Sequence, residues 1–192
     1  MLHLEKGEIY SLRLIGLPHK GLRTTSQILC EAALNEGYCI QGAADNESYR
    51  AGWEDIFIRI CQEPIFYRER PTLYDSTLVA DQKILAKILV DKSLKKGGLL
   101  IVNTRKGLKE LAKSVKFNGR LLPFNASEIA EYFLENDYPA LALLGAWLKI
   151  VPLIDLASVE NVGRERFRNY WDEELMEKNI IGLRMGYNEM NP

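Results

Sequence analysis

The residues best suited to bind a charged ligand lie in one short turn near the start of the chain. Gly16 and Gly21 bound this turn, His19 and Lys20 lie within it, and Arg23 follows it. Glycine lets backbone amides approach an anion closely, and the first turn of a following helix adds partial positive charge. These residue types therefore favour a site for an anionic ligand, with the basic side chains supplying additional charge.

The spacing in this turn excludes two familiar nucleotide-binding motifs. Leu22 follows Gly21 where the P-loop motif requires lysine, and Pro18 stands where the dinucleotide-binding fingerprint requires its second glycine. Proline also lacks an amide hydrogen and stiffens the turn. The residues alone leave two interpretations open: an unusual anion-binding corner, or a tight strand-to-helix connection with solvated basic side chains.

Two further candidates stand where predicted strands end. Asp81 directly follows the short apolar run 76–80, and Asn103 ends the apolar run 98–103. Ligands of open α/β sheets bind outside the carboxyl ends of the strands, so both side chains are candidate ligand contacts. The alternative is that Asp81, Asn103 and Thr104 cap the helices expected to follow them.

A polar segment supplies the last candidates. Arg50 and Gly52 lie in residues 42–53, which we expect to form a loop that ends at Trp53. Functional groups are common on such loops. A solvated face or a contact with another subunit would explain the same charged and aromatic residues.

The sequence contains no recognisable catalytic constellation. Cys30, Cys39 and Cys61 stand singly in apolar stretches, and His3 and His19 add no metal-ligand spacing to them. The odd number of cysteines does not make a disulfide framework, so we expect three small buried hydrophobic residues. We therefore assign this chain no catalytic residue and no metal ligand.

Hydrophobic periodicity indicates strands that alternate with helices. Residues 9–34 form the first unit: a strand, the glycine-bounded turn, and a helix that starts around Thr24, Thr25 and Ser26. Further strands are expected at 38–41, 55–61, 76–80, 98–103 and 120–124, and further helices at 81–94, 104–113, 125–135, 140–150, 153–159 and 173–187. An Asn125-x-x-Glu128 capping box would open the helix at 125–135. The alternation predicts an α/β fold: a single doubly wound, mostly parallel sheet with helices on both faces, formed by residues 1–192 as one domain.

Composition narrows the possible partners and location. The chain has 192 residues, 47% of them hydrophobic, and a net charge of −1. This charge gives no reason to expect binding to nucleic acid or to an anionic membrane. The most apolar stretch, 140–156, is interrupted by charged residues and proline, and the N-terminus lacks a signal-peptide pattern, so we expect a cytoplasmic protein.

Several sequence blocks, in order, resemble one family. They include SQILCEAALNEGYCIQ at 26–41, FIRI followed by EPI at 57–65, and KKGGLLIVNT at 95–104. Further blocks are FNGRL at 117–121, LLGAWLKIV at 143–151, and RMGYNEM at 184–190. With the glycine turn they resemble the gamma subunit of pyruvate or 2-oxoacid:ferredoxin oxidoreductases, and the resemblance covers residues 10–190.

The resemblance implies a subunit that is not active alone. It would assemble with alpha, beta and ferredoxin-like delta subunits into a complex that converts a 2-oxoacid to an acyl-CoA and reduces ferredoxin. Thiamine diphosphate and iron–sulfur clusters would lie in the partner subunits, and this chain would bind no cofactor by itself. Its turn and polar loop would help to enclose the site where CoA reacts.

The chain also departs from the family pattern where a ligand would bind. The family turn is richer in glycine than His19-Lys20-Gly21, and its Asn-Thr-Pro segment is here Ala140-Leu-Ala142. A second hypothesis follows: a divergent, non-catalytic assembly or binding module of the same fold that has lost the ligand-binding turn. In either case the isolated chain would expose apolar area meant for partners, which favours a homodimer in their absence.

Overall fold

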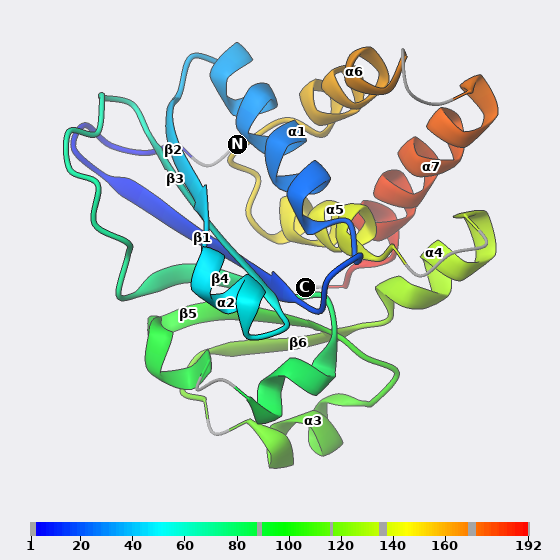
Figure 1. The fold of residues 1–192 in the computed structure, drawn as a ribbon, viewed down its shortest axis with the longest axis horizontal. Helices are drawn as coiled ribbons and strands as arrows, with labels where there is room; N and C mark the ends of the chain where they lie inside the picture. Colours follow the sequence, from blue (N-terminus) through cyan, green and yellow to red (C-terminus); the bar gives the residue numbers. More distant parts are fainter. Residues whose placement is uncertain (1–2, 88–89, 116, 135–137, 169–171, 192) are drawn as a thin grey trace.

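The chain is built around one twisted sheet. The computed structural model describes residues 3–87, 90–115, 117–134, 138–168 and 172–191, and within them six strands take the order β2-β3-β1-β4-β5-β6 (Figure 1). The strands are β1 (Ile9–Gly16), β2 (Cys39–Ala44), β3 (Glu54–Cys61), β4 (Tyr74–Val79), β5 (Leu94–Asn103) and β6 (Arg120–Phe124). β3 runs antiparallel to β1 and β2, whereas the pairs β1–β4, β4–β5 and β5–β6 are parallel. The predicted mostly parallel sheet is confirmed.

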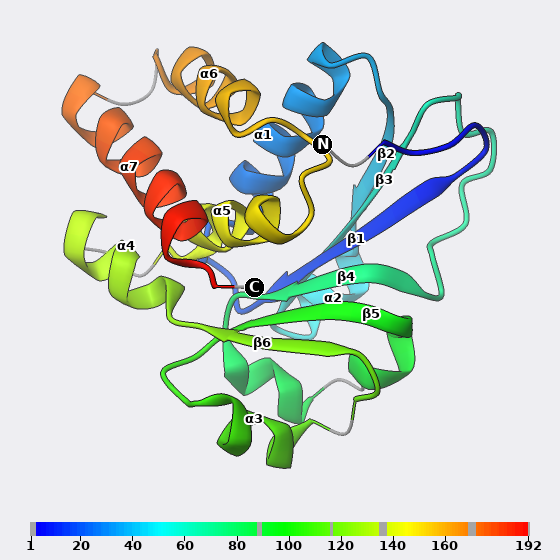
Figure 2. The same cartoon turned by 180° about the vertical axis from the view of Figure 1, so that it is seen from behind.

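Helices cover both faces of the sheet, but unequally. The helices are α1 (Leu22–Asn35), α2 (Asn46–Arg50), α3 (Leu108–Ser114), α4 (Ala126–Leu134), α5 (Ala140–Ile150), α6 (Leu156–Phe167) and α7 (Glu173–Glu189), with short 3₁₀ helices η1 (Gln82–Ala86) and η2 (Val90–Ser93). The long helices α1, α5, α6 and α7 gather with α4 on one face, whereas η1, η2 and α3 lie on the other (Figures 1 and 2). The α/β class with helices on both faces is therefore confirmed.

Alternation along the strands explains the two layers. Successive side chains of a strand point to opposite faces, so one strand supplies two cores. On β1, Leu12 and Leu14 pack in the cluster beneath the long helices, whereas Ile15 packs with Ile84 of η1 and Leu111 of α3. All five side chains are buried.

The long-helix layer depends on two glycines at the crossing of α5 and α7. A Cβ atom on Gly145 would lie 2.0 Å from the Leu183 carbonyl oxygen, and one on Gly186 would lie 2.0 Å from the Ala142 carbonyl oxygen. Both distances are far below any possible contact, so only glycine permits this approach. The helices α5 and α7 thus pack backbone against backbone.

The expected helix at 81–94 is wrong. Gln82–Ala86 and Val90–Ser93 form two short 3₁₀ helices, and residues 88–89 fall outside the described part of the chain. Leu94, the last residue of that expected helix, and the Lys95-Lys-Gly-Gly segment after it belong to β5, because Leu94 pairs with Tyr74 of β4. Gly97 accommodates this extension with a φ of +76°, beside a shift in the β4–β5 register. Sheet pairing has overridden the local helical pattern.

The predicted loop at 42–53 is also partly wrong. β2 continues to Ala44, and the short helix α2 follows. Asp45 caps α2, since its carboxylate accepts hydrogen bonds from the Glu47 and Ser48 amides. The polar residues that suggested a loop are cap and turn residues of a helix.

Three other helices begin at residues different from those expected. α1 begins at Leu22, α3 begins at Leu108 after Gly107 rather than at Thr104, and α6 begins at Leu156 with Asp155 as its cap. In α4 the Asn125 side chain donates to the Glu128 carboxylate, so the pair does not form the reciprocal backbone bonds of a capping box. α4 is described to Leu134, and residue 135 lies outside the described residues.

Candidate functional site

The glycine-bounded turn joins β1 to α1 at the carboxyl end of the sheet. Gly16 ends β1, where an added Cβ would lie 2.9 Å from the Ala80 Cβ atom, so this position keeps the ends of β1 and β4 close together. Gly21 holds the N-cap position of α1 with a φ of +82°. His19 also has a positive φ, +65°, which is uncommon for a residue with a side chain. The predicted strand-turn-helix unit is confirmed.

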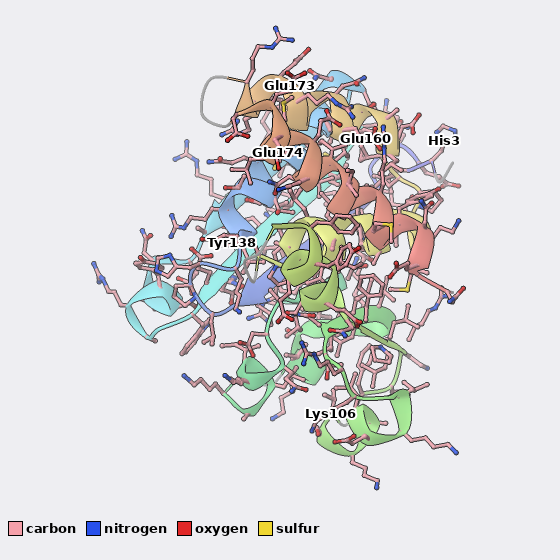
Figure 3. The ribbon with its side chains drawn as sticks, turned by 90° about the vertical axis from the view of Figure 1, so that its right-hand side faces the viewer. His3, Lys106, Tyr138, Glu160, Glu173 and Glu174 are labelled. Atoms are coloured by element: carbon pink, nitrogen blue, oxygen red, sulfur yellow. The ribbon has the colours of Figure 1, made fainter. Side chains whose placement is uncertain are left out.

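A hollow of about 460 Å³ opens beside this turn, at the ends of β4 and β5. It is lined by Lys20, Ala80, Asp81, Gln82, Asn103, Thr104, Arg105, Lys106, Asn125, Ser127 and Glu131. Three of the predicted site residues, Lys20, Asp81 and Asn103, thus lie around one hollow although they are far apart in the sequence. Figure 3 shows Lys106 near α3, while Tyr138 lies next to the turn before α1.

Asp81 caps the short helix that follows it, as the alternative interpretation expects, whereas Asn103 does not cap α3 and instead bonds to other elements. The Asn103 amide nitrogen donates to the Ala80 carbonyl at 2.8 Å and to the Ser127 hydroxyl at 2.8 Å, while its oxygen accepts from the Ser127 amide at 3.0 Å. Asn103 therefore fastens the ends of β4 and β5 to the start of α4. Asp81 caps η1 by accepting from the Lys83 amide at 2.9 Å.

The polar residues around the hollow bond to one another or to nearby side chains. Thr104 donates to the Gln82 side-chain oxygen at 2.7 Å and accepts from the Lys106 amide at 3.0 Å. Arg105 pairs with Glu131 at 2.9 Å, and Lys106 pairs with Glu110 at 3.1 Å. Both pairs are largely exposed, so each is worth less than about 1 kcal/mol and an incoming anion could replace the carboxylate.

The remaining predicted residues lie on the other side of the turn, toward β3. Arg23 pairs with Glu54 at 2.9 Å and stacks over the Tyr49 ring at 5.1 Å. Arg50 ends α2 with an exposed side chain, and Gly52 forms the next turn with a φ of +93°. In the described structure Arg23, Arg50, Gly52 and His19 do not line the hollow.

An ion network centred on the buried Asp55 carboxylate lies near this second group. Arg13 binds the Asp55 carboxylate, and its Nε lies 3.0 Å from Oδ1. Arg70, from the β3–β4 connection, also contacts Asp55 and pairs with Asp45 at 3.0 Å. Bonds from Ser48, the helix amides and Arg70 hold the pKa of Asp45 below its ordinary value. The network thus ties α2 and the β3–β4 connection to the sheet.

The comparisons with known proteins decide the family. The family model described as pyruvate ferredoxin/flavodoxin oxidoreductase matches residues 11–189. The chain belongs to this family. The earlier resemblance to its gamma subunits is confirmed by the relatives that follow.

The relatives of this oxidoreductase subunit match it along nearly its whole length. The pyruvate synthase subunit PorC of Thermotoga maritima is 29% identical over 182 residues, which are 94% of each chain. The common subunit gamma of the pyruvate/ketoisovalerate oxidoreductases of Thermococcus kodakarensis is 31% identical over 180 residues, covering 93% of this chain and 95% of the relative. The gamma-type assignment is therefore independent of any one sequence block.

Solved structures agree with the fold. The crystal structure of the pyruvate oxidoreductase subunit PORC of Thermotoga maritima has a TM-score of 0.81 at 26% identity, covering 95% of this chain and 97% of that one. A 2-oxoglutarate:ferredoxin oxidoreductase of Magnetococcus marinus, solved with 2-oxoglutarate, coenzyme A and succinyl-CoA bound, has a TM-score of 0.79 at 16% identity. This second likeness covers 96% of the gamma-type chain but 31% of the longer one, and it supports the fold alone.

The sequence motifs did not single out Arg105 and Lys106, two of the three basic residues that line the hollow of this gamma-type subunit. Arg105 and Lys106 follow the tip of β5 by two and three residues, and Glu131 and Ser127 come from α4. The available signal was position, because residues directly after a central parallel strand share the carboxyl edge with the glycine turn.

Neither a metal site nor a membrane-spanning helix is found among the described residues. They contain no group of three or more His, Cys, Asp or Glu side chains placed to hold a metal ion. None of their helices has the length and apolar character needed to cross a membrane.

Proposed function

We propose that residues 1–192 act as one gamma-type domain in a 2-oxoacid:ferredoxin oxidoreductase complex with alpha, beta and ferredoxin-like delta subunits. The complex would cleave the bond between the carboxylate and the carbonyl carbon of a pyruvate-like 2-oxoacid. It would release CO₂, pass two electrons to ferredoxin and join the acyl group to the CoA thiol. The observation that carries this proposal is the family match over residues 11–189. Thiamine diphosphate and the iron–sulfur clusters are assigned to the partner subunits on the strength of the family resemblance, and the cytoplasmic location stays a prediction.

The hollow beside the glycine turn is the proposed contact for the anionic part of CoA. Lys20, Arg105 and Lys106 line it, and guanidinium and ammonium groups are the usual partners of phosphate. Exposed pairs with Glu131 and Glu110 currently neutralise two of these cations, and a phosphate would take the place of the carboxylates. Lys20 brings the Gly16–Gly21 turn to the edge of this hollow.

Reconstitution tests the role in the complex. The chain is co-expressed with the alpha, beta and delta subunits, purified through a tag on another subunit, and assayed by viologen reduction with several 2-oxoacids plus CoA. Retention of this chain and activity that depends on it support the proposal. Failure to form a complex, or equal activity when this chain is omitted, contradicts it.

A CoA titration of the assembled complex tests the hollow. Lys20→Ala, Arg105→Ala and Lys106→Ala, which remove the three basic side chains that line the hollow, are compared with Lys96→Ala, an exposed lysine at the opposite end of β5. Loss of one charge-assisted contact predicts an affinity about 10-fold lower in a contacting variant and unchanged in Lys96→Ala. Equal affinity in all four variants would exclude this surface as the CoA contact.

The second function, a non-catalytic assembly module, is favoured by one observation. Arg23 is occupied by Glu54 and Tyr49 within the chain, so the basic residue after the turn already has partners. For such a module, the complex would form but CoA affinity and turnover would not respond to any substitution around the hollow. The two experiments above therefore separate the two functions.

A further inference from the structure

Two of the three cysteines are paired across neighbouring strands. Cys39 opens β2 and Cys61 ends β3, and they are direct partners in the antiparallel register. Their sulfur atoms reach the same short segment: Cys39 Sγ lies 3.8 Å from the Gln62 carbonyl oxygen, and Cys61 Sγ lies 2.7 Å from that of Glu63. Cys61 Sγ also lies 3.5 Å from the Cys39 carbonyl oxygen. The two thiols are therefore neighbours on one face of the sheet, which the sequence, read as isolated small hydrophobic residues, did not indicate.

The register places the pair within reach of a covalent bond. The Asp45 amide donates to the Asp55 carbonyl at 2.8 Å, and hydrogen-bonded pairs recur every second residue, so Cys39 and Cys61 form such a pair. In pairs of this class the Cα atoms are about 5.5 Å apart, inside the range of about 4.4–6.8 Å found in disulfides. In this class of pair the Cβ atoms must draw together by about 1 Å or more, which strains a bond there and makes it more easily reduced.

We propose that Cys39 and Cys61 are a redox modification site that forms a reversible intrachain disulfide with a low-molecular-weight disulfide as oxidant. The thiolate of Cys39 attacks one sulfur of the oxidant, which forms a mixed disulfide and releases one small thiol. Cys61 then attacks the Cys39 sulfur and releases the second small thiol. The protein loses two electrons and two protons, and the oxidant gains both as two thiols.

Burial assigns the order of the two steps. Cys39 is half-buried on the edge strand and meets the oxidant first, whereas Cys61 is buried. Desolvation raises the pKa of the Cys61 thiol, so Cys61 is a poor first nucleophile. Once the mixed disulfide exists, its proximity gives Cys61 a high effective concentration for the second step.

The bond would close the whole β2–α2–β3 hairpin. This hairpin carries Arg50 and Gly52 at its far end, beside the glycine turn, and β2 forms one free edge of the sheet. A cross-link at its base constrains the unfolded chain and fixes the edge strand to β3. Oxidation should therefore raise the unfolding temperature of the full chain without changing its fold.

The test is oxidation of the folded full-length chain with glutathione disulfide, followed by thiol titration and peptide mapping. We expect the three free thiols to fall to one, a mass loss of two hydrogens, and a 39–61 cross-linked peptide that dithiothreitol releases. Cys30→Ser is the matched control and should form the bond unchanged, because Cys30 lies on α1. Cys39→Ser and Cys61→Ala should give no intrachain bond.

Three results would overturn the proposal. They are stable glutathione adducts on Cys39 with no cross-link, a bond that forms only after unfolding in urea, or a cross-link that involves Cys30. If Cys61→Ala fails to fold, Cys39→Ser and the wild-type peptide map still decide the question. The unfolding temperature before and after oxidation gives a second measurement on the wild-type chain.

Discussion

The crossing of α5 and α7 and the surface at the carboxyl end of the sheet are built by opposite means. At the crossing, Gly145 and Gly186 remove side chains so that two backbones touch. At the sheet end, polar side chains such as Asn103 and Asp45 hold backbone segments in place through hydrogen bonds. The first contact admits almost no substitution, whereas the second can exchange one polar partner for another. A ligand site can evolve in the second region and not in the first.

Gly186→Ala should produce the largest effect. Its Cβ atom would lie 2.0 Å from the Ala142 carbonyl oxygen, so α5 and α7 must separate. We expect the free energy of unfolding to fall by about 3 kcal/mol or more, the upper range for overpacked sites. Urea unfolding followed by circular dichroism measures this change.

Gly182→Ala provides the control on the same helix. An added Cβ there would meet only the Ile129 Cγ2 atom, at 4.0 Å, so it fits without movement. Alanine is also favoured over glycine within a helix by about 1 kcal/mol. Stability should be unchanged or higher, and equal losses in both variants would show that the crossing is not the constraint.

Asn103→Ala should have the next largest effect. The substitution leaves the Ala80 carbonyl and the Ser127 amide without their partner at a buried position. We expect a loss of about 2 kcal/mol in unfolding free energy, the usual cost of buried groups left unpaired. Asn161→Ala, on the exposed face of α6, should change stability by less than about 0.5 kcal/mol.

Measuring both CoA affinity and stability in Asn103→Ala shows whether Asn103 contacts the ligand or only supports the fold. If Asn103 contacts CoA directly, the variant complex would lose affinity at temperatures where the chain stays folded. If Asn103 only fastens β4, β5 and α4, affinity should follow the folded fraction. An unchanged free energy of unfolding would contradict the role of Asn103 in joining β4, β5 and α4.

The sequence predicted the sheet and its helix layers well, because hydrophobic periodicity and the burial of apolar residues decide which segments become strands and helices. The strand-turn-helix unit at 9–34, the strand at 120–124 and the helix at 140–150 were predicted close to their observed bounds. The predictions were wrong where pairing with a distant segment decides the structure. Leu94, for example, belongs to β5 because it pairs with Tyr74 of β4. Local periodicity cannot report a partner 20 residues away.

The candidate site was predicted only in part for a similar reason. Lys20 was recognised as a basic residue of the glycine-bounded turn, and Asp81 and Asn103 from their places at strand ends; all three line one hollow. Arg23 was named for its charge, but its pairing with Glu54 depends on where β3 begins. Which side of the turn a basic side chain faces is decided by the order of strands in the sheet.

Asp45→Ala should have a moderate, pH-dependent effect. The carboxylate caps α2 and pairs with Arg70, and its pKa is held below the ordinary value chiefly by the Ser48 hydroxyl. We expect a loss of about 1 kcal/mol at pH 7, the usual value of an N-cap.

The sign of the pH dependence follows from the lowered pKa. A carboxyl with a folded-state pKa below its unfolded value contributes stability above the unfolded pKa, about 3.9, and loses this contribution as pH falls through the folded pKa. The difference between wild type and Asp45→Ala should therefore shrink below about pH 4. Urea unfolding at neutral and acid pH measures it, and a difference that grows in acid would contradict the assignment.

Glu54→Gln should have the smallest effect, and it tests whether the surface at the sheet end exchanges partners. Glu54 holds Arg23 at 2.9 Å, and the Arg23 side chain is 51% exposed. Neutralising the carboxylate releases a cation beside the glycine turn, so the assembled complex should bind CoA about two- to five-fold more tightly, the range set by an exposed ion pair. Glu47→Gln removes the same charge from the exposed surface of α2 and should leave affinity unchanged. Equal tightening in both variants would indicate a general field effect, and no change in either would contradict the exchange of the Arg23 partner for CoA.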